Sequence, residues 1–216
     1  MRIAINKAHY PVTVLGPGKR IGIWLQGCSI RCPACVSQDT WASDTGREME
    51  VAALLAWCRR VAADGVDGIT LSGGEPFDQA GPLTGLLKAL HHWRARSGRG
   101  FDILCYSGYP LDRLRRKHAG ILALLDAIIP EPYVDGLPLA HVWRGSANQP
   151  LVPLSPRGAA RYAEYLAAPA EDGRRMQVAA DGGRLWFIGI PQRGDMAALE
   201  DLCRQRGLTM DAVSWR

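Results

Sequence analysis

The sequence of 216 residues lacks the apolar segments that direct proteins into or across membranes. No apolar run approaches the ~20 residues that a membrane-spanning helix needs. The first twenty residues do not combine an apolar core with a small-residue cleavage site, so no secretory signal peptide is predicted. With 47% apolar and 22% charged residues, the composition is that of an ordinary soluble protein. We therefore expect a cytoplasmic protein with no membrane partner.

Repeats, low-complexity stretches and linker-like segments are also lacking. The length suits one hydrophobic core, so a single domain over residues 1–216 is expected. The net charge of +5 comes mostly from scattered arginines, and residues 115–118 (RRKH) form the one dense basic run. Such a run is most often a solvated helix face. We expect no nucleic-acid partner.

The cysteines are too unevenly placed for a disulfide framework. Cys58, Cys105 and Cys203 are scattered through segments that look helical or strand-like, and Cys58 lies on an apolar helix face where a core residue is expected. The other three fall within eight residues. This distribution favours a reducing compartment.

The clustered cysteines, Cys28, Cys32 and Cys35, have the spacing C-x3-C-x2-C within GCSIRCPACVSQDTW at 27–41, and no fourth cysteine follows nearby. A structural zinc site fills four tetrahedral positions, and a four-iron cluster commonly takes four thiolates. Three thiolates on such a cluster leave one iron free to bind a ligand. A zinc or structural iron site in a binding module is the non-enzymatic alternative.

Strand-like and helical patterns alternate through the first 130 residues. Apolar strand patterns are followed by amphipathic helical patterns, with strands expected at residues 20–26, 67–71, 101–106 and 125–129. Alternation of this kind predicts parallel βα units in an α/β sheet or barrel. Functional loops should lie at the carboxyl ends of the strands.

Residues 130–156 break this pattern with irregular, proline-rich sequence. The segments expected after it are a short helix at 157–167, two strands at 175–180 and 184–190 joined by Asp181-Gly182-Gly183, and a helix at 195–206.

Two further loops follow expected strands and should place their residues at the same edge of the sheet as the cysteines. In SGGEP, Gly73 and Gly74 allow a close backbone approach, Glu75 offers an acceptor for an ammonium group, and Pro76 fixes the turn. A lone GGEP is equally well a tight turn capped by an acid. The third loop, SGYP, begins at Ser107.

With these motifs, the sequence resembles the radical S-adenosylmethionine superfamily, and within it the small glycyl-radical-enzyme activating proteins, in particular those of anaerobic ribonucleotide reductases. The matching core covers about residues 20–150. The segments that carry the resemblance are GCSIRCPACVSQDTW, LSGGEPFDQ at 71–79, YSGYP at 106–110 and WRGSANQ at 143–149.

The resemblance implies a partial (β/α)6 TIM-type barrel with parallel strands. It also implies a [4Fe–4S] cluster on Cys28, Cys32 and Cys35, with S-adenosylmethionine on the open iron. The residues it assigns to S-adenosylmethionine are Gly73, Gly74, Glu75 and Pro76 at the amino group, Ser107 and Gly108 in the pocket wall, and Gly189 and Ile190 against adenine.

The implied reaction begins when an electron donor such as flavodoxin or ferredoxin reduces the cluster. Cleavage of a carbon–sulfur bond then gives a 5′-deoxyadenosyl radical that abstracts hydrogen from the substrate. The protein's tasks are alignment and the exclusion of water and oxygen.

The substrate is the least determined part of the prediction. Residues 143–149 suggest a loop for a substrate or partner, formed by Arg144, Ser146, Asn148 and Gln149. Such an arginine suits a carboxylate or carbonyl of a docked peptide, whereas a turn bonding its own backbone is the simpler reading. The segment Pro130-Glu131-Pro132-Tyr133 departs from the family's aspartate-glycine-proline-aromatic pattern. A glycine of a glycyl radical enzyme is therefore expected, with a small metabolite or ribosomal peptide as the alternative.

Overall fold

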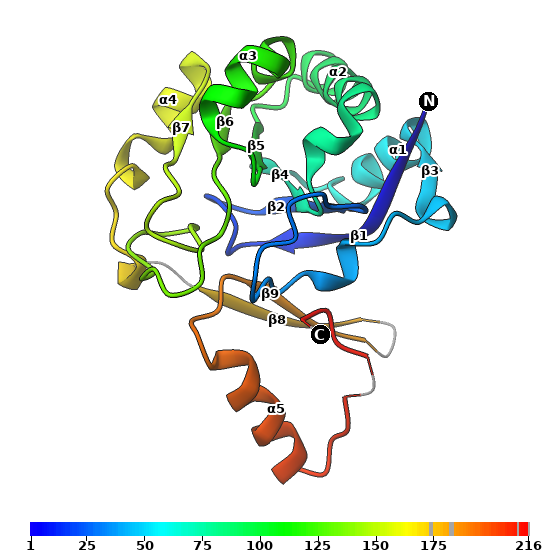
Figure 1. The fold of residues 1–216 in the computed structure, drawn as a ribbon. Helices are drawn as coiled ribbons and strands as arrows, with labels where there is room; N and C mark the ends of the chain where they lie inside the picture. The colour runs from blue at the N-terminus through cyan, green and yellow to red at the C-terminus, as the bar shows by residue number, and fades with distance from the viewer. Residues whose placement is uncertain (173–174, 182–183, 211, 216) are drawn as a thin grey trace.

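The computed structural model describes residues 1–172, 175–181, 184–210 and 212–215. Its centre is a mixed seven-stranded sheet in the order β3-β1-β2-β4-β5-β6-β7, with helices packed along it (Figure 1). The strands of this sheet are β1 (Arg2–Val12), β2 (Arg20–Leu25), β3 (Glu48–Glu50), β4 (Gly68–Gly73), β5 (Asp102–Tyr106), β6 (Ala127–Ile129) and β7 (Val152–Pro153). The helices are α1 (Val51–Val61), α2 (Ala80–Ser97), α3 (Leu111–Leu122), α4 (Pro156–Tyr162) and α5 (Asp195–Gln205).

Parallel pairing is confirmed for the four strands that the sequence predicted, β2, β4, β5 and β6. The flanking strands β1, β3 and β7 pair antiparallel, which the sequence did not predict. Strand β1 is hard to recognise locally because its residues RIAINKAHYPV alternate poorly and include Pro11. Its antiparallel pairing with β2, rather than its own residue pattern, makes this segment a strand.

Alternation along the parallel strands separates the core from the functional face. Ile23, Leu71 and Cys105 point into the main core, which lies against α1, α2 and α3. The next residue of each strand (Trp24, Ser72 and Tyr106) lines a cavity on the opposite face. Because successive side chains of a strand point to opposite faces, one set of strands builds both the core and the cavity wall.

The helices of the first 130 residues agree with the sequence patterns. Helix α1 buries Val51, Leu54 and Cys58, so Cys58 is confirmed as a core residue. Helix α2 buries an apolar stripe and ends at Gly98, whose φ of 64° is the left-handed conformation that glycine adopts readily. Its buried residues are Leu83, Leu86, Leu87, Leu90 and Trp93.

The segment after residue 153 adds a short helix, a second sheet and a final helix. Strands β8 (Met176–Asp181) and β9 (Arg184–Gly189) pair antiparallel, as predicted, and form a sheet of their own. Two residues of the predicted connection, 182 and 183, lie outside the described residues. Helix α4 ends earlier than predicted and continues as a 3-10 turn, Ala163–Tyr165. Helix α5 extends away from the main body (Figure 1). Within the described ranges, no helix is long and apolar enough to cross a membrane.

A buried charge network closes the amino ends of the parallel strands. Two guanidinium nitrogens of Arg20 donate to the two carboxylate oxygens of Asp102 at 3.0 and 2.7 Å, and Nε donates to Thr70 at 2.7 Å. The hydroxyl of Tyr162, from α4, donates to the same carboxylate. Arg20 is fully buried, and a Cβ at Gly68 would lie 2.0 Å from its Nη1. The network therefore depends on glycine at position 68 and ties α4 to the sheet.

Candidate functional site

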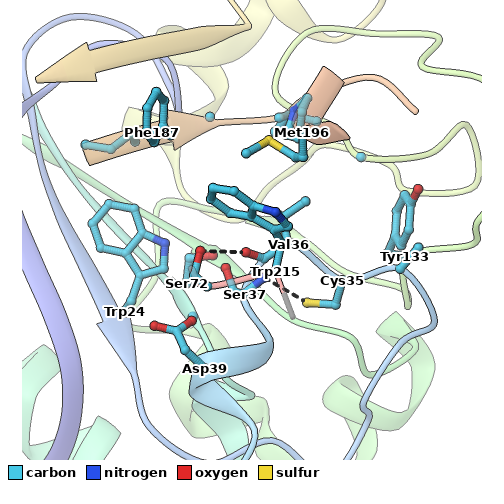
Figure 2. Close-up of a pocket in the computed structure, with 18 of the residues that line it drawn as sticks. Trp24, Cys35, Val36, Ser37, Asp39, Ser72, Tyr133, Phe187, Met196 and Trp215 are labelled. Carbon is cyan, nitrogen blue, oxygen red and sulfur yellow. Dashed lines mark hydrogen bonds between the residues drawn. The ribbon is translucent and has the colours of Figure 1, made fainter. Parts of the chain in front are cut away.

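The loops after β2, β4 and β5 meet at the carboxyl ends of the strands, as the sequence predicted. Together they line a cavity of about 1100 Å³. The loop after β2, residues 27–41, contains Cys28, Cys32 and Cys35 and is called the cysteine loop below. Figure 2 shows part of this cavity, with Cys35 beneath Tyr133 and Trp24 on the side of the sheet.

The cysteine loop is closed at its base by backbone hydrogen bonds. Gly27 N donates to Thr40 O at 2.7 Å, and Cys28 N donates to Trp41 O at 3.1 Å. Between these ends the chain turns sharply, because Arg31 and Ala34 have φ of 51° and 58°. This path presents all three thiols to one cavity, where each is half-buried and free of disulfide bonding.

The cysteine thiols lie close enough to influence each other's ionisation. Burial raises the pKa of the Cys28 thiol, and the backbone amides of Arg31 and Ile30 oppose this shift. Burial likewise raises the pKa of Cys32, which the backbone amide of Tyr133 opposes and the charge of Cys35 reinforces. Adjacent half-buried thiolates repel one another unless a cation lies between them. The donor set fits an iron–sulfur cluster.

Among the described residues, no three His, Cys, Asp or Glu side chains are gathered as ligands of a single metal ion. A four-iron cluster distributes its thiolates over separate irons, so its ligands do not converge on one atom. The fit to a cluster therefore rests on the three thiols sharing one cavity. The half-buried indole of Trp41 lines the same cavity, and its buried Nε1 has no hydrogen-bond partner.

Gly73 and Gly74 allow close backbone packing. A Cβ at Gly73, where φ is 98°, would lie 2.4 Å from Leu25 N, and one at Gly74 would lie 2.0 Å from Gly27 O. Gly74 N donates to Leu25 O at 2.9 Å. The close approach that the sequence predicted toward a ligand is, in this structure, an approach to the start of the cysteine loop. The two glycines therefore set the distance between the first and second loops.

Glu75 is a buried carboxyl group in the wall of the cavity. One carboxylate oxygen accepts from Phe77 N at 3.0 Å and Ser107 Oγ at 2.8 Å, and the other accepts from Gly108 N at 2.7 Å. No basic side chain of the described residues pairs with it. Burial raises its pKa to about 7, against the effect of these three donors. Glu75 is thus a carboxyl group close to its ionisation point at neutral pH.

Pro76, Ser107 and Gly108, which the resemblance also assigned to the cofactor pocket, lie around Glu75. Pro76 is buried at the start of the 3-10 helix η3 (Pro76–Gln79), which Glu75 caps. Ser107 is buried, and its Oγ also accepts from Tyr109 N at 3.1 Å. Gly108 lies against the cysteine loop, since a Cβ there would be 3.0 Å from the side chain of Ile30. Both Ser107 and Gly108 line the cavity.

A polar cluster not singled out from the sequence joins all three loops. The carboxylate of Asp78 accepts from Ser29 N at 2.7 Å, from Ser29 Oγ at 3.0 Å and from Tyr109 OH at 2.6 Å. Ser29 lies beside the first cysteine, Asp78 follows GGEP and Tyr109 belongs to SGYP. Their position inside the three recognised motifs is the signal that could have identified them. The cluster fixes the cysteine loop to the other two loops.

The loop at 143–149 makes its hydrogen bonds inward, which agrees with the simpler reading of its sequence. Arg144 is buried and donates through Nη2 to Tyr165 O and Leu166 O at 2.7 and 2.9 Å. The carbonyls it holds belong to its own chain. The other predicted side chains bond nearby backbone: Ser146 to Val134 N, Asn148 to Pro132 O, and Gln149 to Glu131 O and Gly145 N.

Gly189 and Ile190 line the cavity from the opposite side to the cysteine loop. Gly189 is the last residue of β9 and Ile190 follows it, so both belong to the hairpin that forms a sheet of its own. Ile190 N donates to Arg175 O at 2.8 Å, and a Cβ at Gly189 would lie 1.9 Å from that oxygen. Glycine is therefore required there by the hairpin itself.

This chain is similar to several known proteins. Residues 14–152 match the family described as "4Fe-4S single cluster domain". The anaerobic ribonucleoside-triphosphate reductase-activating protein of Salmonella typhimurium is 31% identical over 155 residues, which is 65% of this chain and 93% of that protein. The pyruvate formate-lyase-activating enzyme of Listeria monocytogenes is 39% identical over 72 residues, 31% of this chain and 28% of that enzyme. The crystal structure of QueE from Escherichia coli has a TM-score of 0.46 at 18% identity, covering 96% of this chain and 92% of that one.

Proposed function

Since this chain belongs to the 4Fe-4S single cluster domain family, and within it to the activating proteins of anaerobic ribonucleotide reductases, we propose that it is a radical S-adenosylmethionine enzyme that activates a partner protein. The observation that carries this proposal is the single cavity shared by three free cysteines and a buried, unpaired carboxyl group.

In this proposal, Cys28, Cys32 and Cys35 would hold a [4Fe–4S] cluster beside bound S-adenosylmethionine. When bound, the two cofactors would supply the radical chemistry that removes a hydrogen atom from the substrate. The backbone amides near the cysteines donate to the thiolates and lower the cost of burying them. The closed base of the loop keeps the three sulfurs on one side.

Glu75 is proposed to bind the amino group of S-adenosylmethionine. Its carboxylate already accepts three hydrogen bonds, so its position is fixed before a ligand arrives. An amino group with N–H donors supplies the interaction that no basic side chain of the described residues provides. Gly73 and Gly74 hold Glu75 next to the cysteine loop, while Pro76, Ser107 and Gly108 fix its orientation. Gly189 and Ile190 are proposed to contact adenine from the far wall.

The substrate is proposed to be a glycine in a glycyl radical enzyme; in support, the matched relatives are named as activating proteins of an anaerobic ribonucleoside-triphosphate reductase and of pyruvate formate-lyase. Tyr133 lines the cavity and its backbone amide faces Cys32, so the divergent segment 130–133 lies beside the proposed cluster. A ribosomal peptide or small metabolite is the second candidate. The inward hydrogen bonds of Arg144 favour it, because they hold Nη2 of this side chain on carbonyls of its own chain rather than on a partner.

Four wider expectations remain proposals. The four parallel strands and their helices support a shortened (β/α)6 barrel, and the hairpin lining the cysteine cavity supports one domain over residues 1–216. Six unpaired cysteines support a reducing cytoplasm. A flavodoxin or ferredoxin is the proposed electron donor.

Anaerobic reconstitution tests the proposal. The wild-type protein should take up about four irons and release 5′-deoxyadenosine with S-adenosylmethionine and dithionite. Cys32→Ala should lose both the cluster and the product, whereas Cys58→Ala, at a buried core position away from the cavity, should keep both. Uptake of iron by the wild-type protein with no 5′-deoxyadenosine would reject the radical chemistry. An unaltered cluster in Cys32→Ala would remove Cys32 from the ligand set.

A further inference from the structure

The cavity has a wall that lies outside the family match. That match ends at residue 152, whereas β8, β9, α5 and residues 212–215 follow it. The alignment with the Salmonella relative uses 93% of that protein and 65% of this chain, so the surplus sequence belongs to this chain. Residues of this surplus, including Phe187, Met196 and Trp215, line the cavity opposite the sheet (Figure 2). Residues 212–215 are called the strap below.

The strap is hydrogen-bonded directly to the cysteine loop. Ser214 Oγ donates to Val36 O at 3.0 Å, and Ser214 O accepts from Asp39 N at 3.3 Å. Gln38 Nε2 donates to Trp215 O at 3.0 Å. These contacts begin one residue after Cys35, the last cysteine of the motif. The strap therefore crosses the loop that carries the proposed cluster ligands.

Trp215 places an aromatic ring inside the cavity. Its Nε1 donates to Glu200 Oε1 at 2.5 Å, which joins the strap to α5. Its ring meets Phe187 of β9 edge-on, with centroids 6.4 Å apart. Figure 2 shows the indole between Met196 and Phe187 on one side and Ser37 on the other. A large substrate approaching from this side would meet Trp215 before it reached Cys35.

The wall is held less firmly than the sheet it faces. Helix α5 buries one side chain, Cys203, whereas α2 buries five. The strap itself is half-buried or exposed throughout. Elements with few buried apolar contacts open at a lower free energy than the core does. The strap can therefore leave its position without unfolding the sheet.

We propose that the strap is a gate over the cofactor cavity, and that Trp215 is the residue that determines how large a substrate reaches the cofactor. With Trp215 in place, small molecules enter and a folded polypeptide is excluded; displacement of the strap admits a polypeptide segment. This inference rests on the proposed function for the identity of the cavity as the cofactor site. The gate itself rests on the contacts between the strap and the cysteine loop.

The gate is tested by the reactivity of Cys35 in the full-length, reduced, cluster-free protein. Alkylation by N-ethylmaleimide is compared with alkylation by a bulky polyethylene-glycol maleimide, and each cysteine is followed by peptide mass spectrometry. Cys58 and Cys105 are buried in the main core, away from α5 and the strap, and serve as internal references for general loosening. In the wild-type protein, Cys35 should be alkylated much faster by N-ethylmaleimide than by the polyethylene-glycol maleimide.

Trp215→Ala should raise the rate of Cys35 with the bulky reagent by about tenfold, since it removes both the ring and its hydrogen bond. Ser214→Ala removes one hydrogen bond and should raise that rate by about threefold. Leu208→Ala is the matched control, because Leu208 is exposed, lies near the strap and does not line the cavity. Wild-type rates at Cys35 in both strap variants, with the reference cysteines unchanged, would overturn the gate.

A second measurement separates the gate from the proposed function. In the reconstituted enzyme, 5′-deoxyadenosine release from S-adenosylmethionine should persist in Trp215→Ala, because the small cofactor already enters the wild-type cavity. If neither protein released 5′-deoxyadenosine, the proposed function would fail while the alkylation result still decided whether the strap closes the cavity. If the wild-type enzyme released it and the bulky reagent reached Cys35 equally in all variants, only the gate would fail.

Discussion

Arg20 lies at the amino ends of the parallel strands and Glu75 just past their carboxyl ends, and both side chains are buried. The charge of Arg20 is matched by Asp102 through two hydrogen bonds, with Thr70 and Tyr162 completing the network. The carboxyl group of Glu75 meets hydrogen-bond donors but no cation among the described residues, and its pKa is raised to about 7. One end of the strands is electrostatically complete, whereas the other needs a ligand.

This difference indicates that the two ends of the same strands serve different roles, one in stability and the other in ligand binding. A buried ion pair with all its hydrogen bonds made has no remaining capacity for a ligand. A buried carboxyl group that lacks a cation retains that capacity, and perturbed carboxyl groups in cavities are common at functional sites. The amino ends should therefore determine folding, and the carboxyl ends should determine cofactor binding. Four substitutions test this division, taken from the largest expected effect to the smallest.

Asp102→Ala should have the largest effect on stability. It leaves the buried guanidinium of Arg20 without its partner, which should lower the free energy of unfolding by about 3–5 kcal/mol. Denaturant unfolding of the cluster-free protein measures this loss. Asp112→Ala, in an exposed pair with Arg115, should change stability by about 0.5 kcal/mol or less. A similarly small change in Asp102→Ala would contradict the structural role of the amino-end network.

Glu75 should make the free energy of unfolding fall as pH rises, whereas a salt-bridged acid makes it rise. Its pKa is raised from 4.5 to about 7, so the folded protein binds more protons than the unfolded chain between these values. Stability from this group is therefore present below about pH 4.5 and is lost as pH rises to 7, by roughly 3 kcal/mol at most.

Urea unfolding from pH 5 to pH 8 measures this dependence. Glu75→Gln should flatten the curve by removing the titration, although the amide cannot accept all three hydrogen bonds and should cost some stability at every pH. Identical pH profiles for the two proteins would show that Glu75 does not titrate in this range. That result would remove the contrast between the two ends of the strands.

Gly74→Ala should disturb the junction between the first and second loops. Its Cβ would lie 2.0 Å from Gly27 O, so the backbone must move, at about 1–3 kcal/mol. Thermal unfolding and iron retention after reconstitution should both decrease. Gly81→Ala is the matched control, because a Cβ there meets nothing within 4 Å and alanine favours its helix. Equal behaviour of the two variants would mean that Gly74 does not set the loop spacing.

Tyr109→Phe should have the smallest effect, confined to the cysteine loop. It removes the hydroxyl that donates to Asp78 and should destabilise the protein by about 1 kcal/mol. Iron loss to a chelator should become faster. Tyr10→Phe removes a hydrogen bond to Gly65 O outside the cavity, so it should cost a similar amount without changing iron loss. If both variants lost iron at the wild-type rate, the Ser29–Asp78–Tyr109 cluster would not hold the loop.

The sequence predicted the parallel strands and the convergence of three loops because both are encoded locally. Apolar runs followed by turn residues such as glycine or proline identify strands, and parallel strands bring their carboxyl ends to one edge. The roles of individual residues at that edge are not local. Gly73 and Gly74 were expected to approach a ligand, but their nearest neighbours are Leu25 and Gly27. Only the pairing of β4 with β2 determines this contact.

The inward direction of Arg144 and the position of the strap could not be predicted from the sequence either, because both depend on contacts between distant segments. Arg144 bonds carbonyls 21 and 22 residues further along the chain, and Ser214 bonds a carbonyl 178 residues away. Polar residues in a loop suit a partner or their own backbone equally well, so the sequence left both readings open. Contacts between distant segments decide between them.

Electron paramagnetic resonance of the reduced, reconstituted protein, with and without S-adenosylmethionine, tests most directly whether the carboxyl ends are built for a ligand. Binding beside the cluster should change the signal in the wild-type protein, and Glu75→Gln should need a higher concentration for the same change. Identical spectra with and without S-adenosylmethionine in the wild-type protein would contradict the account.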